Sequence, residues 1–136
     1  MKISTRGRYA LRFMLYLATQ ETDSYITLKD VSNHENISIK YLEQIAALLS
    51  KEKFLDSVRG PQGGYKLSKA PSEYTVADIL RVTEGNLAPV ACLESIENPC
   101  ERKAECLTLP FWLGLQNTIN NYLESVTLQN IIEKQF

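Results

Sequence analysis

Apolar side chains recur at helical spacing through the N-terminal part of the chain. The run from Tyr9 to Ala18 has no Gly or Pro and predicts a mostly buried first helix, for which Thr5 is available as the N-cap. Thr27 and Asp30 are spaced as in a capping box and predict a short second helix. After a polar turn, Ser38 can cap a third helix whose apolar residues form one stripe. This order of elements is the helix-turn-helix plan.

Beyond Phe54 the apolar spacing changes from helical to alternating. Residues 55–59 and 65–68 alternate on either side of the segment 60–64, in which three glycines and one proline make a loop. Two strands that flank such a loop form a hairpin. A hairpin that follows a helix-turn-helix is a wing.

The C-terminal half contains two more helical patterns, separated by an irregular segment. Thr75 can cap a fourth helix that ends just before Gly85. Residues 86–108 show no regular pattern and hold all three cysteines. Residues 109–126 then predict a long amphipathic helix, after which Thr127 can cap a short last helix.

These patterns predict a mainly α fold, a winged helix-turn-helix domain with a two-stranded wing plus a long C-terminal dimerisation helix. We expect the DNA-binding domain in residues 1–85, a cysteine-bearing, cluster-binding loop in 86–108, and the dimerisation helix with the short C-terminal helix in 109–136. A chain of 136 residues has room for one core and an appended element. The long helix has more apolar surface than such a chain easily covers, which favours a homodimer.

Composition sets limits on the class of protein. The apolar fraction of 44% and the charged fraction of 23% are typical of globular proteins and argue against disorder. No apolar run approaches the roughly eighteen residues of a membrane span. The N-terminus has a basic flank but no apolar stretch followed by a cleavage site. We therefore expect a cytoplasmic protein with no membrane partner.

The net charge of −1 conceals an uneven distribution of charge along the chain. Residues 1–70 hold eleven Lys or Arg against seven Asp or Glu, and residues 71–136 hold four against nine. Phosphate attraction requires local positive charge and not a positive total. The basic N-terminal half is therefore compatible with a DNA-facing module, although two domains of unlike surface charge without any nucleic acid would show the same asymmetry.

The third predicted helix carries candidate base-reading residues near its N-terminus, where a recognition helix enters the major groove. Gln44 can pair with adenine, Glu43 can accept a hydrogen bond from cytosine, and Lys40 can reach a guanine or a phosphate. Ser38 and Tyr41 lie on the same turn and complete this set. The alternative is a merely solvated helix face. The order of helix-turn-helix and wing on the basic half favours DNA binding.

Three arginines outside that helix are further candidates for DNA contact. Arg59, at the mouth of the wing, can enter the minor groove or hold a phosphate. Arg6 and Arg8, at the start of the first helix, can hold phosphates.

The cysteines form the second candidate site. Cys92, Cys100 and Cys106 are separated by seven and five residues, and an odd number of cysteines in a cytosolic chain argues against a disulfide framework. Thiolates gathered on a loop suit zinc or an iron-sulfur cluster. Three unrelated buried thiols or a reversible redox pair are the alternatives. His34 is the single histidine, and its position in the predicted turn favours a plain surface role for it. Carboxylates close enough in sequence to complete a site belong to Glu94, Glu97, Glu101 and Glu105.

Four segments together resemble the bacterial winged-helix regulator family of IscR, CymR, NsrR and RirA. They are residues 5–10, residues 37–44, residues 58–65, and Cys106-Leu107-Thr108 with Trp112. The resemblance runs nearly from end to end. It implies a dimer built on the long helix, palindromic double-stranded operator DNA as the partner, DNA contacts at Ser38, Lys40, Tyr41, Glu43, Gln44 and Arg59, and cluster binding by Cys92, Cys100 and Cys106.

The chain departs from the family pattern at four points. IscR has a histidine three residues after the last cysteine, where this chain has Leu109, which cannot bind metal. NsrR recruits an aspartate from the start of the partner's first helix, where this chain reads Arg6-Gly7-Arg8. Lys40 stands where IscR has a smaller residue, and the first cysteine spacing is two residues longer than in IscR. The fourth cluster ligand is therefore unassigned.

The sequence predicts a transcription regulator, and we expect a repressor of genes for iron-sulfur cluster assembly or for cysteine and sulfur metabolism. An iron-sulfur cluster, [2Fe–2S] in preference to [4Fe–4S], would modulate its operator binding. One alternative is a repressor that responds to cysteine status, redox state or nitric oxide through thiol chemistry or a partner protein. Another is a protein-interaction module. An enzyme is not expected, because no nucleotide loop, metal-hydrolase motif or carboxylate pair stands out.

Overall fold

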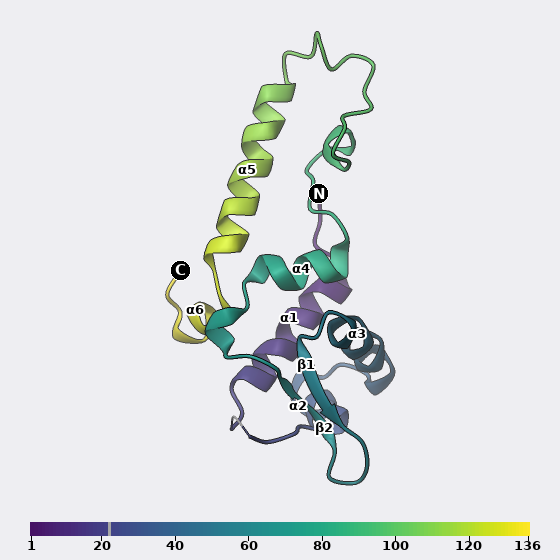
Figure 1. Cartoon of the computed structure of the whole chain (residues 1–136), viewed down its shortest axis with the longest axis vertical. Helices are drawn as coiled ribbons and strands as arrows, with labels where there is room; N and C mark the ends of the chain where they lie inside the picture. Colours follow the sequence, from purple (N-terminus) through teal and green to yellow (C-terminus); the bar gives the residue numbers. More distant parts are fainter. Residues whose placement is uncertain (22) are drawn as a thin grey trace.

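The computed structural model describes residues 1–21 and 23–136. In these residues the chain forms a bundle of helices around one antiparallel hairpin, and a single long helix extends away from the bundle (Figure 1). The predicted mainly α fold with a two-stranded wing is confirmed. The elements are α1 (Thr5–Ala18), α2 (Leu28–Glu35), α3 (Ile39–Lys51), β1 (Leu55–Val58), β2 (Gly64–Leu67), η1 (Pro71–Glu73), α4 (Val76–Glu84), η2 (Ala91–Leu93), α5 (Leu109–Ser125) and α6 (Leu128–Glu133).

Hydroxyl side chains begin most of the helices. Thr27, Ser38, Thr75 and Thr127 cap α2, α3, α4 and α6 as predicted, each accepting a hydrogen bond from a backbone N–H of the first turn. At α1 the predicted cap is wrong by one residue. Ser4 has the extended conformation of an N-cap, with φ −68° and ψ 162°, and its hydroxyl accepts from the Gly7 N–H, so Thr5 already lies inside the helix.

The wing is an antiparallel pair in which Leu55 lies opposite Leu67 and Val58 lies opposite Gly64. A third segment supports its base, because Ile26 and Tyr65 exchange two backbone hydrogen bonds of 2.8 Å. Gly64 is required there, since its φ is +147° and an added Cβ would lie 2.3 Å from the Ile26 carbonyl oxygen. The start of the helix-turn-helix is thereby fastened to the wing.

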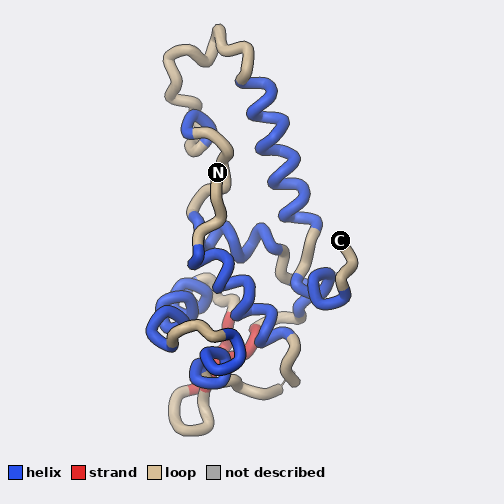
Figure 2. Tube along the Cα trace, turned by 180° about the vertical axis from the view of Figure 1, so that it is seen from behind, coloured by secondary structure: helices blue, strands red, loops and turns tan. Residues whose placement is uncertain are grey.

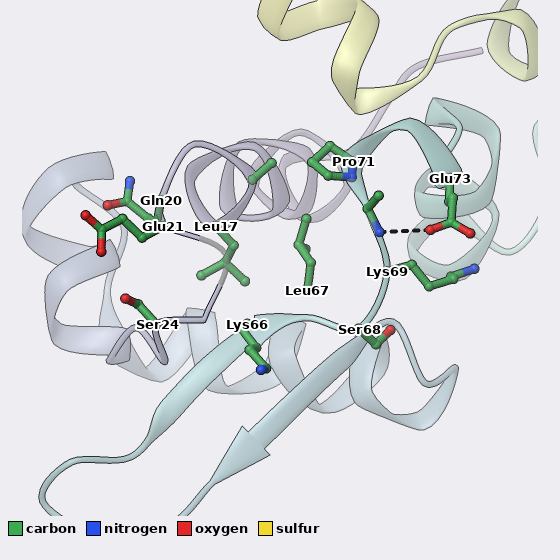
Figure 3. Close-up of a pocket in the computed structure, with 12 residues that line it drawn as sticks. Leu17, Gln20, Glu21, Ser24, Lys66, Leu67, Ser68, Lys69, Pro71 and Glu73 are labelled. Atoms are coloured by element: carbon green, nitrogen blue, oxygen red, sulfur yellow. Dashed lines mark hydrogen bonds between the residues drawn. The ribbon is translucent and has the colours of Figure 1, made fainter.

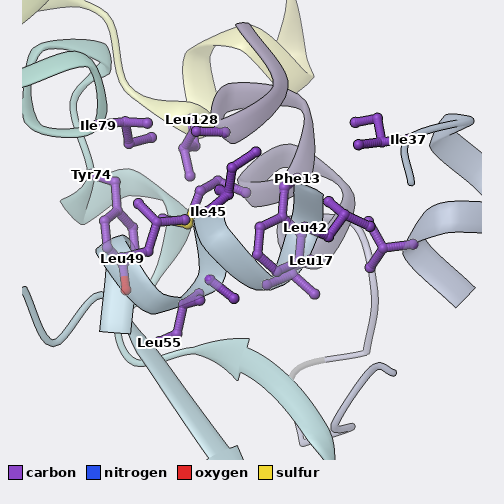
Figure 4. Packing of buried hydrophobic residues seen from close by; sticks show 14 residues of the cluster. Phe13, Leu17, Ile37, Leu42, Ile45, Leu49, Leu55, Tyr74, Ile79 and Leu128 are labelled. Atoms are coloured by element: carbon purple, nitrogen blue, oxygen red, sulfur yellow. The ribbon is translucent and has the colours of Figure 1, made fainter. Parts of the chain in front are cut away.

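Helix α1 passes through the centre of the core (Figure 4). Its buried residues Ala10, Phe13, Met14 and Leu17 pack against the apolar face of α3 and against residues of the wing, α4 and α6. This packing explains why α1 is apolar on most of its circumference. The remaining buried members of the cluster are Val31, Ile37, Leu42, Ile45, Ala46, Leu49, Leu55, Tyr74, Ile79 and Leu128.

The last helix returns to this core, which the sequence did not indicate. Leu128 is fully buried, and its N–H donates to the Tyr74 carbonyl at 3.0 Å. The Val76 N–H donates to the Val126 carbonyl at 2.8 Å, so the segments before α4 and α6 pair side by side. Tyr74 is itself anchored, because its hydroxyl donates to the Phe54 carbonyl at 2.7 Å. The end of the chain therefore helps to build the winged-helix core.

Helix α5 stands apart from the bundle, and the cysteine loop lies at its far end (Figure 1, Figure 2). No residue of α5 is buried, and Phe111 and Tyr122 are 64% and 55% exposed. The loop is irregular apart from one short 3₁₀ turn, η2. Among the described residues, no helix is both long and apolar enough to cross a membrane.

We expect Leu128→Ala to lower the free energy of unfolding by about 2–5 kcal/mol, because it leaves a cavity in the core between α1 and Tyr74. Urea unfolding followed by circular dichroism measures this loss. Phe136→Ala is the matched control, because Phe136 is 71% exposed, and it should change stability by less than about 0.5 kcal/mol. An equally small effect of Leu128→Ala would show that α6 does not belong to the core.

Candidate nucleic-acid interface and cysteine loop

The N-terminal half of α3 presents its polar residues to solvent. Lys40, Glu43 and Gln44 are exposed, while the opposite face of the helix is buried against α1. Ser38 is exposed as well, and its oxygen accepts from the Tyr41 N–H at 3.2 Å. The fold therefore places the predicted base-reading side chains on one accessible surface.

Tyr41 differs from the other predicted contacts because its ring has a protein partner. The ring is half-buried and packs edge-on against Tyr9 of α1, with centroids 5.5 Å apart and an angle of 73° between the planes. Edge-to-face packing of this kind is favourable for aromatic pairs. Tyr41 thus connects α3 to α1 in addition to lying beside the exposed surface.

The two predicted phosphate contacts in α1 have different surroundings. The Arg6 guanidinium donates two hydrogen bonds, of 3.2 and 2.9 Å, to the Thr83 carbonyl at the end of α4. Arg8 is exposed and donates to the Thr5 hydroxyl at 3.1 Å. Arg59 is exposed in the loop of the wing, at the end of the molecule opposite to the cysteine loop (Figure 1).

The start of α1 is clamped to the end of α4. Glu84 accepts hydrogen bonds from the Ser4 N–H and hydroxyl at 2.9 and 2.7 Å through the same carboxylate oxygen. Gly7 is buried against this carboxylate, and an added Cβ would lie 2.2 Å from it. Gly85 follows with φ +81° and begins the segment that leads to the cysteines. Sequence reasoning missed this clamp, which joins residues 80 positions apart.

A second polar contact joins α1 to the end of α2. Arg12 donates to the Glu35 carboxylate at 3.0 Å, and His34 Nδ1 lies 2.7 Å from the other carboxylate oxygen. Partial burial opposes ionisation of Glu35, but the hydrogen bonds from His34 and Arg12 outweigh it and lower the pKa of the carboxyl below its ordinary value of 4.5. His34 itself is exposed, and its ring lies tilted by 38° against the ring of Tyr16, with centroids 4.6 Å apart.

The three cysteines are free thiols, each partly exposed on the segment between α4 and α5. The Cys106 sulfur lies 3.3 Å from the Thr108 hydroxyl. This hydrogen bond and a second one from the Thr108 backbone lower the pKa of the Cys106 thiol. Cys100 is held through its N–H, which donates to the Asn98 side chain at 2.9 Å.

The chemistry of this donor set fits an iron-sulfur cluster, because three thiols on one loop are the ligands that such clusters prefer. Their geometry is not preformed. Within residues 1–21 and 23–136, no three His, Cys, Asp or Glu side chains are grouped closely enough to hold a metal ion. Cluster binding would therefore require the loop to fold more tightly. His34 is on α2, at the other end of the molecule from the loop (Figure 1).

A cavity of about 480 Å³ lies between the end of α1 and β2 (Figure 3). Leu17 and Leu67 face each other across its apolar part, and both acidic and basic side chains, Glu21 and Lys66 among them, lie around it. The described residues that line it include no histidine or cysteine. They therefore offer no nucleophile paired with a histidine base.

The winged helix-turn-helix with an exposed polar face on α3 defines the class of protein as a winged-helix DNA-binding regulator. The chain belongs to the Rrf2 family, described as iron-dependent transcriptional regulators, whose family model matches residues 3–134. The prediction of a transcriptional regulator and not an enzyme is thereby confirmed, as is the predicted family.

Individual relatives support the same assignment. The chain is 37% identical to the regulator CymR of Bacillus subtilis over 131 residues, which cover 96% of this chain and 89% of CymR. It is 33% identical to IscR of Photorhabdus laumondii, covering 99% and 81% of the two chains.

Solved structures of CymR and of IscR are also similar to the structure of this chain. The structure of B. subtilis CymR, titled the global cysteine regulator, matches with a TM-score of 0.80 at 32% identity over 98% of both chains. That of T. potens IscR matches with a TM-score of 0.78 at 32% identity, over all of this chain and 89% of IscR. The likeness therefore extends over nearly the whole chain for both.

The lowered pKa of Glu35 predicts an acid-dependent contribution to stability. Because the folded state favours the ionised carboxyl, this contribution is present above the ordinary pKa of 4.5 and is lost as the pH falls through the lower folded pKa. The stability advantage of the wild type over Glu35→Gln should therefore shrink as the pH falls from neutral to below 4.5. Urea unfolding at each pH measures the difference, and a constant difference would contradict the assignment.

Proposed function

We propose that the chain is a homodimeric repressor that reads a palindromic operator with α3 and the wing. The observation that carries this proposal is the exposed set of Lys40, Glu43 and Gln44 on α3, together with Arg59 on the wing. These side chains offer donors and acceptors that match base edges in the major groove and phosphate or minor-groove contacts beside it. The excess of positive charge in residues 1–70 supports the same surface.

The exposed apolar side chains of α5 support the homodimer. Phe111, Leu113 and Tyr122 are exposed large hydrophobic residues on one long helix. Covering such surface with a second copy removes it from water and places two reading helices about a two-fold axis. A two-fold pair of reading helices matches a palindromic site.

We expect Gln44→Ala and Arg59→Ala each to weaken binding of the selected operator by about tenfold, since a good base-edge contact supplies about 1–3 kcal/mol. The operator is the duplex that the wild type enriches from a random-sequence pool, and fluorescence anisotropy measures the affinity. Gln129→Ala, at a half-buried position of α6 outside α3 and the wing, is the matched control and should leave binding unchanged.

Salt dependence separates this function from a protein-interaction module. Contacts with phosphates release counterions, so the affinity for DNA should fall steeply as salt concentration rises. Enrichment of no sequence, or full binding by both variants, would overturn the proposed reading surface.

We further propose that Cys92, Cys100 and Cys106 hold an iron-sulfur cluster, [2Fe–2S] in preference to [4Fe–4S], and that its presence modulates operator binding. The free, partly exposed thiols on one segment support this proposal, and the family description and the similarity to IscR agree with it. When bound, the cluster would supply a response to iron, sulfide or oxidants. The regulated genes would serve iron-sulfur cluster assembly or cysteine and sulfur metabolism.

The fourth ligand has no candidate at the position after the cysteines, because Leu109 offers no donor atom. Leu109 lies in the first turn of α5 and is half-buried. The chain therefore supplies three thiolate ligands to the proposed cluster. The fourth ligand would be an oxygen donor or a residue of a second copy.

The alternative is a repressor that responds to cysteine status, redox state or nitric oxide through thiol chemistry or a partner protein without a cluster. Two observations favour it. The pKa of the Cys106 thiol is lowered by Thr108, and the thiols are accessible to oxidants. The similarity to CymR, titled a global cysteine regulator, agrees with a role in cysteine metabolism.

Anaerobic reconstitution distinguishes the two proposals. We expect iron and sulfide to bind the wild type with visible thiolate-to-iron absorption, and Cys100→Ala to lose both, because one of three thiolates is removed. Ser95→Ala, on the same segment, is the control and should retain them. An absence of iron in the wild type, combined with reversible oxidation of its thiols that changes operator affinity, would overturn the cluster and favour the alternative.

A further inference from the structure

One face of α1 contacts both helices of the helix-turn-helix through side chains at helical spacing. Tyr9, Arg12 and Tyr16 lie three and four residues apart and therefore share a face. Tyr9 packs edge-on against Tyr41 of α3, and the Tyr16 ring lies 4.6 Å from that of His34 in α2. Arg12 is between these two aromatic contacts.

Arg12 makes three contacts that fix its guanidinium. Its Nε donates to the Glu35 carboxylate at 3.0 Å, its Nη2 donates to the Glu35 backbone carbonyl, and its guanidinium carbon lies 5.3 Å from the centroid of the Tyr9 ring. The last carbonyls of a helix have no partner within the helix, so Arg12 caps the end of α2. A cation at this end is also favoured by the helix dipole.

Glu35 is followed directly by the turn of the helix-turn-helix. Asn36 has the left-handed conformation, with φ 56°, Ile37 is buried, and Ser38 is the N-cap of α3. Only these residues separate the carboxylate that Arg12 binds from the N-terminus of the proposed reading helix. The position of Glu35 relative to α1 therefore fixes where α3 starts.

We infer that Arg12 is a positioning residue for DNA reading: its bond to Glu35 holds the turn so that α3 presents its base-reading residues at the right angle. This inference rests on the proposed function of α3. Arg12 is partly exposed, so a direct contact with a DNA phosphate is the competing explanation for any role in binding.

The two explanations predict opposite effects of removing Glu35. If Arg12 binds phosphate, Glu35→Ala frees its guanidinium and removes a negative charge, so binding of any DNA becomes tighter or stays the same. If Arg12 positions α3, Glu35→Ala weakens binding of the selected operator in spite of the gain in net positive charge. Only a change in geometry explains that loss.

The experiment measures the affinities of wild type, Arg12→Ala, Glu35→Ala and the double variant for two duplexes. One is the duplex that the wild type enriches from a random-sequence pool, and the other has the same composition in scrambled order. We expect Glu35→Ala to weaken binding of the selected duplex by about two- to fivefold, as the loss of one ion-paired contact allows, with little change for the scrambled duplex. The double variant should be no weaker than Arg12→Ala, because the two residues act as a unit.

The pair of Arg81 and Glu124 provides the matched control. It joins α4 to α5, and the Arg81 side chain is about as exposed as that of Arg12. Among the described residues, neither Arg81 nor Glu124 forms a side-chain hydrogen bond or ion pair with α2 or α3. Arg81→Ala and Glu124→Ala should leave the affinity for the selected duplex unchanged. Thermal unfolding of every variant identifies losses of binding that come from unfolding alone.

Each outcome decides between the hypotheses. Unchanged or tighter binding by folded Glu35→Ala overturns the positioning role while the proposed function stands, as long as Gln44→Ala weakens binding. Failure of the wild type to select any sequence overturns both. A variant that unfolds is replaced by Glu35→Gln, which keeps the size of the side chain and should weaken binding in the same direction.

Discussion

The burial of α1 is the constraint on which the rest of the structure depends. Phe13, Met14 and Leu17 are buried in the same cluster as residues of α2, α3, the wing, α4 and α6, so the apolar faces of these elements pack around α1. Dense packing of this kind resists small displacements, since removing even one buried side chain leaves a cavity that the surroundings only partly fill. Helix α1 therefore holds the elements that pack around it in fixed positions.

Polar contacts on the outer surface of α1 connect this helix to the two candidate sites. At its start, Ser4 and Arg6 are bound to the last turn of α4, one residue before the segment that carries the cysteines. Further along, Arg12 is bound to the end of α2, next to the turn that precedes α3. Charge-assisted hydrogen bonds have defined directions, so they fix the orientation of a helix more narrowly than apolar contacts do. The cysteine segment and the proposed reading helix are thus attached to the same helix.

The surfaces that the fold leaves uncovered are those that the proposed function uses. The polar face of α3 and the wing loop are open to solvent, and α5 has no buried residue. The cysteine segment has little regular structure and few internal hydrogen bonds among its described residues. Such a segment can change conformation at low cost, which is a property expected of a sensing element.

The sequence by itself determined the element order, the wing and four of the five predicted helix caps, because these depend on local periodicity, hydroxyl side chains and glycine positions. It also identified the exposed residues of α3 and the three cysteines, since residue type and spacing carry that information. The tertiary structure alone decided the clamp of Glu84 on Ser4, the bond between Arg12 and Glu35, and the return of Leu128 to the core. These contacts join residues far apart in the chain. A local sequence pattern does not determine which distant residue packs against it.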